Sequence, residues 1–180
     1  LLSEDALEYY DYKLGGTVNV FNSQAYVIDF DQRENVDFPL YKGKLFLDVG
    51  NLAIVGIAFE ISPRMIERVS EFLIRKKPVG MTVDVESGNY LVNYRKIDEV
   101  WYLNYVRTEL VFRVKWKKEL FRSTYTTMSE LAVTDIILEN VEKYKFRESA
   151  KFTDIFVEQV SDFEDPAFWG DYNIIKPDES

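Results

Sequence analysis

Apolar and polar residues alternate with a period of two along much of the chain, which is typical of β-strands. The clearest example is residues 107–116, where Leu110, Phe112, Val114 and Trp116 fall on one face. The pattern predicts eight or nine strands in all. Strand-forming residues are concentrated at residues 17–21, 25–30, 41–48, 52–60, 81–86, 89–97, 100–105 and 107–116, and again over residues 120–137.

Short connections separate several of these segments. Gly50 and Asn51 supply turn residues after the segment that ends at position 48, and Asp98 with Glu99 forms a second tight turn. Residues 31–39 are polar and contain a proline, which indicates a loop. Because sequential strands with short connections pair as antiparallel neighbours, the sequence predicts an antiparallel sheet.

One helix is marked by residues at both of its ends. Ser62 suits the N-cap, Pro63 suits the first helical position, and Pro78 with Gly80 closes the segment. The apolar residues between them form one face, which we expect to pack on the sheet and to bury Phe72. That face consists of Met65, Ile66, Val69, Phe72 and Leu73.

The two ends of the chain have less regular patterns. Residues 5–13 follow a suitable N-cap at Ser3, and we expect a short helix there. Residues 146–160 carry a weaker helical pattern. Residues 161–180 are aromatic, acidic and interrupted by proline. Because exposed aromatic side chains favour contact with other apolar surfaces, we expect this segment to pack across the domain as an extended strap, and the alternative is a linker.

These elements predict a mainly β protein with one or two helices. The expected architecture is a curved antiparallel sheet, or half-barrel, wrapped on a helix and crossed by the C-terminal strap. The length of 180 residues suits a single domain, 1–180, that buries a sizeable core.

The composition excludes several kinds of chemistry. The chain has no Cys and no His, which excludes disulfides, thiol nucleophiles, Ser-His-Asp triads and sites built on imidazole or thiolate. Its 22 basic and 31 acidic residues give a net charge of −9, and no basic patch dominates, which argues against binding of nucleic acid. No apolar run has the length of a membrane span. We expect neither a cofactor nor a metal.

Acidic residues gather at two places, around Asp29, Asp31 and Glu34 and again at residues 162–171. Carboxylates are ligands for Ca²⁺, but the first group lacks the glycine and the spacing of an EF-hand. We therefore interpret both groups as carboxylates that face water. Strand carboxylates such as Glu109 do not by themselves indicate a glycosidase, which needs a pair with a defined separation and one raised pKa. We expect a protein without catalytic activity.

Aromatic side chains are the strongest candidates for a binding surface, since 16% of the residues are Phe, Trp or Tyr. They could stack on sugars or line an apolar groove, although cross-strand aromatic pairs in an ordinary core are the more common arrangement. The helix contributes two further apolar candidates. The candidate ligand-binding residues are Trp101, Tyr102, Tyr105, Tyr125, Phe72 and Met65.

Several segments are distinctive, namely YVIDFD at residues 26–31, YKGKLFLD at 41–48, LAIV at 52–55, LVNYRK at 91–96, WYLNYVR at 101–107 and FWGDYNII within 165–177. They resemble the C-terminal region of Gram-negative envelope proteins labelled carboxypeptidase-like regulatory domain-containing. In that family a β-sandwich precedes this region. The resemblance implies a fragment of a longer envelope protein in the periplasm or cell envelope, with its signal peptide removed, and it implies no peptidase.

The expected architecture is also similar to the half-barrels of periplasmic lipoprotein carriers and of a lipoprotein-sensing sigma-factor regulator. Three hypotheses for the function follow. The first is a non-catalytic envelope module that binds a protein partner or a hydrophobic ligand. The second is a carrier or sensor of acyl chains or lipoproteins. The third is a carbohydrate-binding or carbohydrate-active module.

Overall fold

The computed structural model describes residues 4–74, 76–143, 145–146, 149 and 151. The chain divides into two compact units, Leu1–Val133 and Thr134–Ser180, and the helices and strands described here all lie in the first. The predicted strap at residues 161–180 lies outside the described residues, as does most of residues 146–160.

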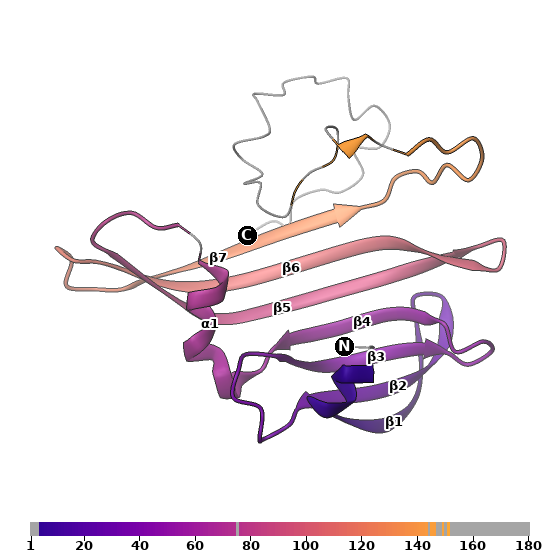
Figure 1. The fold of residues 1–180 in the computed structure, drawn as a ribbon, viewed down its shortest axis with the longest axis horizontal. Coiled ribbons are helices and arrows are strands. Elements are labelled where there is room, and N and C mark those ends of the chain that lie inside the picture. Colours follow the sequence, from indigo (N-terminus) through magenta and orange to yellow (C-terminus); the bar gives the residue numbers. More distant parts are fainter. Residues whose placement is uncertain (1–3, 75, 144, 147–148, 150, 152–180) are drawn as a thin grey trace. The chain divides into compact units, whose positions relative to one another are not determined.

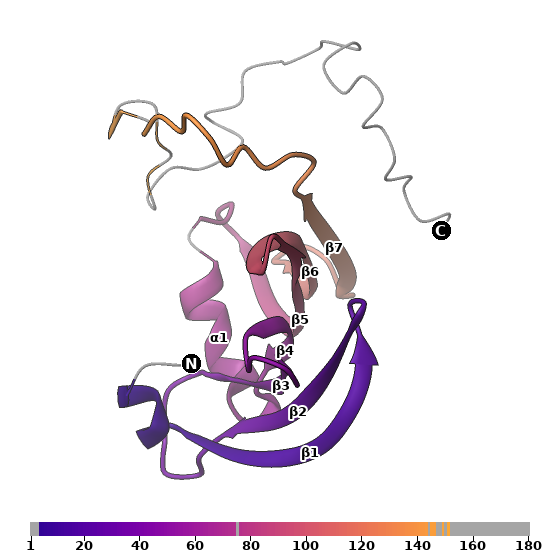
Figure 2. The ribbon, with the colours of Figure 1, turned by 90° about the vertical axis from the view of Figure 1, so that its right-hand side faces the viewer.

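Seven antiparallel strands form one open sheet in which each strand pairs with the next along the chain (Figure 1). The prediction of a curved antiparallel sheet is therefore confirmed. Figure 2 shows the sheet twisted and curved, with the helices η1 and α1 on the same side of it. The strands are β1 (Tyr10–Val20), β2 (Ser23–Gln32), β3 (Tyr41–Asp48), β4 (Ile54–Ile61), β5 (Met81–Ile97), β6 (Val100–Trp116) and β7 (Ser123–Ala132).

The sheet has seven strands where the sequence predicted eight or nine. The difference arises because two pairs of segments that were predicted as separate strands each form one continuous strand. Residues 81–97 form the single strand β5, which bulges at Glu86 and continues to pair with β6 through Ser87 and Gly88. Residues 100–116 likewise form one strand. A bulge shifts the alternation of side chains without ending the strand. The apolar–polar pattern in the sequence is therefore interrupted at a bulge, although the hydrogen bonds between the strands continue on both sides of it.

The prediction of a helix over residues 5–13 is wrong beyond its first turn. A 3₁₀ helix, η1, spans Glu4–Glu8, and β1 then begins at Tyr10. Tyr10 pairs with Gln32, and this register continues to the pair of Leu14 and Ile28. Pairing with an adjacent long strand outweighs the weak helical preference of a short segment.

The turn between β3 and β4 is confirmed where the sequence placed it. The Asp48 carboxylate accepts hydrogen bonds from the backbone N–H groups of Gly50 (2.9 Å) and Asn51 (3.1 Å). The Ser23 hydroxyl also donates to this carboxylate, and that hydrogen bond is the main reason that the pKa of Asp48 is lowered. The carboxylate therefore ties the turn to the start of β2.

The marked helix is shorter than predicted. A 3₁₀ turn, η2 (Pro63–Met65), leads into α1 (Ile66–Leu73). α1 lies along the part of β5 that extends beyond β4, because β4 pairs only with residues 89–93 of that strand. The Ser70 hydroxyl accepts a hydrogen bond from the backbone N–H of Val85 at 2.9 Å. α1 thus covers a strand edge that would otherwise be free.

The prediction that Phe72 is buried is wrong. Val69 is 4% exposed and packs with Ile61 and Val85, whereas Phe72 is 66% exposed. The reason is that α1 covers a strand edge with one narrow stripe of its surface. Phe72 belongs to the predicted apolar face but falls outside that stripe.

Apolar side chains are buried on both sides of the sheet. We call the side that carries η1 and α1 the helix face, and the other side the opposite face. On the helix face, Ala6 of η1 packs with Tyr10 and Phe30. The alternation of side chains along β2 places Ala25 and Val27 on the opposite face, where they form a separate cluster with Phe46 and Val55.

Among the described residues, no helix has both the length and the apolar character needed to cross a membrane.

Candidate functional site

A pocket of about 480 Å³ opens on the helix face between η1 and the sheet. Four strands, η1 and the loop between β2 and β3 contribute to it, so residues far apart in the sequence meet there. We call it the helix-face pocket. The described residues that line it are Ala6, Tyr9, Tyr10, Phe30, Phe38, Leu40, Tyr41, Ile57 and Phe59.

Aromatic rings form the floor of the pocket. The rings of Tyr41 and Phe59 meet edge to face at 5.2 Å, and Phe59 stacks on Tyr90 at 4.8 Å. Tyr10 and Phe30 make a second edge-to-face pair at 5.7 Å. Such pairs contribute about 0.5–1.5 kcal/mol each beyond the area they bury, so the floor is held in one arrangement.

A glycine in β3 allows the strands beneath this floor to approach closely. Gly43 pairs with Phe59, and a Cβ atom at position 43 would lie 2.6 Å from the Phe59 Cα atom and closer still to the Ala58 carbonyl oxygen. These are backbone atoms, which cannot move aside as the end of a flexible side chain could. A side chain at position 43 would therefore push β3 and β4 apart beneath the floor.

The loop that forms one wall is held by a buried side chain. Gln32 is 2% exposed, and its amide nitrogen donates to the carbonyl oxygens of Val36 (2.9 Å) and Phe38 (3.0 Å). Its amide oxygen accepts from the backbone N–H of Leu40 at 3.0 Å. The loop thus obtains from one side chain the hydrogen bonds that a strand would obtain from its neighbour.

A smaller pocket of about 160 Å³ adjoins the first on the side of α1. Phe38, Leu40 and Tyr41 line both pockets and so form a wall that the two pockets share. The described residues that line the smaller pocket are Phe38, Pro39, Leu40, Tyr41, Ile61, Val69, Phe72 and Leu73. The two pockets together form a continuous apolar surface.

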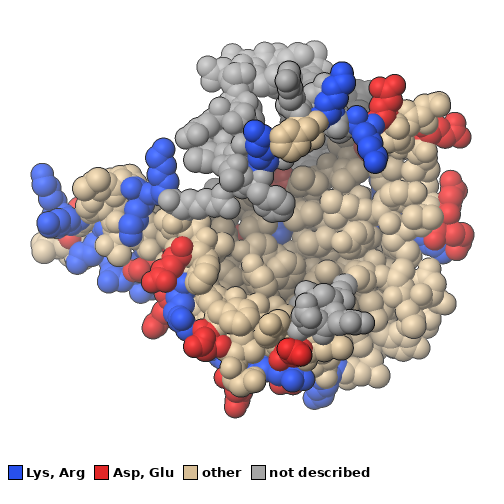
Figure 3. All heavy atoms as spheres, in the orientation of Figure 1, with Lys and Arg blue, Asp and Glu red and all other residues tan. Residues whose placement is uncertain are grey.

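Neither pocket is lined by a charged group among the described residues. Figure 3 shows uncharged atoms over the middle of the helix face, with Lys, Arg, Asp and Glu gathered towards its margins. Phenols are neutral at physiological pH, and burial raises the pKa of Tyr10 and that of Tyr90 further. The two pockets can therefore accommodate an apolar group, and among the described residues no charged side chain lines them that could pair with an ion.

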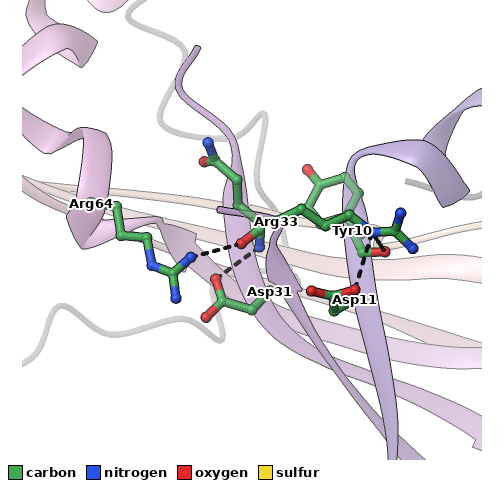
Figure 4. A network of polar contacts seen from close by, with 6 residues as sticks. Tyr10, Asp11, Asp31, Arg33 and Arg64 are labelled. Atoms are coloured by element: carbon green, nitrogen blue, oxygen red, sulfur yellow. Dashed lines mark hydrogen bonds and ion pairs between the residues drawn. The ribbon is translucent and has the colours of Figure 1, made fainter. Parts of the chain in front are cut away.

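A polar network lies beside the pocket, at the ends of β1 and β2 (Figure 4). The Arg33 Nε atom donates to the carbonyl oxygen of Tyr10 (3.2 Å) and contacts the Asp11 carboxylate at 3.0 Å. Arg64 of η2 donates to the carbonyl oxygen of Gln32 at 3.2 Å. Exposed ion pairs of this kind stabilise little, and the network serves to fix the chain on both sides of the loop.

The acidic residues of the first group considered for Ca²⁺ each have another partner, and the second group, at residues 162–171, lies outside the described residues. Asp29 pairs with Lys44 at 2.6 Å, and Glu34 lies 3.7 Å from Arg64. Asp31 accepts a hydrogen bond from the backbone N–H of Gln32. Within the described part of the chain, no three acidic side chains gather in a way that could hold a metal ion.

The structure does not bring the six sequence-predicted binding residues together. Phe72 lines the smaller pocket, and Met65 lies nearby in η2, half-buried. Trp101 packs on the cluster of the opposite face, where its indole nitrogen has no hydrogen-bond partner among the described residues.

The remaining three predicted residues lie on β6 and β7. Tyr102 is half-buried opposite Arg95 of β5, and Tyr125 is 55% exposed on β7. The hydroxyl of Tyr105 donates to the Glu130 carboxylate, and burial together with this carboxylate raises the pKa of Tyr105.

The residues of the helix-face pocket were missed by the sequence analysis. Tyr9 and Tyr10 fell in a predicted helix, and Phe38 fell in a predicted loop. A usable signal was present, because Phe38, Pro39 and Leu40 are apolar at the end of an otherwise polar loop. Apolar residues in a loop indicate that the loop packs against an apolar surface of the protein.

Comparison of the chain with protein-family models gave no match, and comparisons with curated proteins and with solved structures gave none either.

Proposed function

We propose that this protein is a non-catalytic binding module that holds a hydrophobic ligand, such as an acyl chain, in the helix-face pocket. The observation that carries the proposal is an aromatic pocket of about 480 Å³ with no charged lining among the described residues. Pockets that bind small molecules are typically apolar and about 300–1,000 Å³ in volume. The pocket lies within that range.

The absence of catalysis is supported by the composition. The chain has no His and no Cys, so general acid–base or nucleophilic chemistry would depend on carboxylates, hydroxyls and amines. The resemblance of the sequence to envelope proteins supports a location in the periplasm or cell envelope. A module of this kind would present the ligand or sense it, and a protein partner could act on the occupied form.

Binding of the uncharged fluorescent probe N-phenyl-1-naphthylamine to the full chain tests the proposal. We expect saturable binding that palmitate displaces. The variant Phe38→Asp places a carboxylate at a half-exposed wall shared by both pockets, and we expect it to weaken binding at least about tenfold, since an unpaired charge is costly in an apolar site.

Phe121→Asp is the matched control, because Phe121 is 83% exposed in the connection between β6 and β7 and lines neither pocket. It should bind the probe as the natural sequence does. Circular dichroism should show that both variants are folded. Probe binding that is not saturable, or that both substitutions weaken equally, would contradict the proposal.

A further inference from the structure

Among the described residues, the longest unpaired strand edges are the part of β5 beside α1, the outer edge of β1 and the outer edge of β7, and the first two are protected. The free part of β5 is covered by α1, through the hydrogen bond between Ser70 and Val85. β1 carries Asp11 and Lys13 and is bent by a bulge at Gly15. Charged side chains, bulges and covering helices are the devices by which proteins keep strand edges from pairing with other chains.

The third edge, β7, has neither a bulge nor a covering helix among the described residues. β7 pairs with β6 over ten consecutive residue pairs without a bulge, and all ten of its residues are exposed. It contains no proline and one charged residue, Glu130, which lies near Arg107 and the Tyr105 hydroxyl of β6. Among the described residues, no strand pairs with its outer edge.

The backbone groups that face outward can be assigned from the register. The N–H of Val133 donates to the carbonyl oxygen of Asn104 at 2.9 Å. Because hydrogen-bonded and non-hydrogen-bonded pairs alternate in an antiparallel ladder, every second residue before Val133 also bonds to β6. The residues between them direct their N–H and C=O groups away from the sheet. These residues are Thr124, Thr126, Met128, Glu130 and Ala132.

We propose that β7 pairs with β7 of a second copy of this chain, in an antiparallel arrangement that joins the two sheets across a two-fold axis. The charged residues near the two ends of β7 are the reason for proposing a second copy of this chain as the partner. Arg122 precedes β7 and Glu130 lies near its end. An antiparallel pair places the basic end of one strand against the acidic end of the other, so the edge is complementary to itself.

One register satisfies both the hydrogen bonds and the charges. With the axis at Thr126, that residue faces its own copy, and Thr124 faces the partner's Met128. Arg122, whose side chain is half-exposed beside Asp84, then lies opposite the partner's Glu130. Thr124, Thr126, Met128 and Glu130 direct their backbone groups outward, so the hydrogen bonds between the two copies of β7 can form in this register.

Cysteine crosslinking tests this register without interference, because the natural chain has no cysteine. In a hydrogen-bonded antiparallel pair the Cα atoms are about 5.5 Å apart, which a disulfide can span. Under mild oxidation, Thr126→Cys should give a covalent dimer on a non-reducing gel. Thr124→Cys is the matched control, since its two copies would lie about 13 Å apart along the strands and should not crosslink. Equal crosslinking of both variants, or of neither, overturns the proposal.

Light scattering of the full chain without substitutions gives an independent test. We expect a molar mass that rises with concentration towards twice the 21.2 kDa of one chain. Thr126→Pro removes an outward N–H and leaves the hydrogen bonds to β6 in place, so it should give a folded monomer. Thr126→Lys should do the same by placing two like charges across the axis. A natural chain that stays monomeric, or a Thr126→Lys variant that still dimerises, overturns the proposal.

Discussion

The carboxamide of Gln32 shows how one side chain can shape an apolar pocket that it does not line. Its three hydrogen bonds reach Val36, Phe38 and Leu40, and the last two of these residues form the wall between the two apolar pockets. A buried amide in this role is specific, because each of its polar atoms must meet a complementary group.

Replacing Gln32 with Leu should lower the free energy of unfolding by about 3 kcal/mol, since it leaves buried backbone groups without partners. Chemical denaturation with urea measures this loss, and binding of N-phenyl-1-naphthylamine should weaken as the wall loosens. Gln24→Leu is the control, because Gln24 lies on the same strand with an exposed side chain. A loss below about 1 kcal/mol for Gln32→Leu would mean that the loop is held by other contacts.

The helix α1 acts at the scale of the element by covering the end of β5. Its buried residue, Val69, packs with Ile61 and Val85 together with the partly buried Ile66, while Phe72 borders the smaller pocket and is largely exposed. An amphipathic pattern in the sequence therefore overestimates how much of this helix is buried. A helix that packs on a strand edge needs a narrower apolar stripe than one that lies across a sheet.

Val69→Ala should destabilise the protein by about 2 kcal/mol, the combined effect of two lost methyl groups and the cavity they leave. Phe72→Ala should cost less than about 1 kcal/mol, because most of that ring already faces water. Thermal and urea unfolding of the two variants measure the difference. A larger loss of stability for Phe72→Ala than for Val69→Ala would show that α1 packs on β5 with the face that carries Phe72.

The sheet as a whole is rich in tyrosine, and burial raises the pKa of several of these phenols. Tyr10 and Tyr90 are the clearest cases, and desolvation is the main cause for both. A raised pKa in the folded state means that the folded protein keeps the phenolic proton when the unfolded chain has lost it. The stability from the neutral phenols is complete below the unfolded value of about 10 and is lost as the pH rises through the folded value.

We therefore expect the free energy of unfolding to be level from about pH 8 to about pH 9 and to fall above about pH 10. Urea unfolding across this range measures the slope. Tyr10→Phe should make the fall less steep, because the phenylalanine ring has no proton to lose. Tyr125→Phe, at an exposed position on β7, serves as the control. An identical slope for Tyr10→Phe and the natural sequence would contradict this account.

The sequence predicted the sheet better than the site. β3 was predicted at its observed bounds, Tyr41–Asp48, and the turn at Asp98 and Glu99 joins β5 to β6 as expected. Both depend on local features, namely side-chain alternation and turn residues with positive φ. The pocket depends on contacts between η1, four strands and a loop, and no local pattern records such contacts.

The alternation of apolar and polar residues by itself determined a mainly antiparallel β protein, because only a pleated strand places alternate side chains on the same face. Only the tertiary structure decided which residues surround the pocket and which strands lie at the edges of the sheet. Tyr10 and Phe38 face the same pocket because the chain folds back on itself, and β7 is an edge strand because β6 alone pairs with it among the described residues. Burial and strand neighbours belong to the folded molecule, since they depend on residues far apart in the sequence.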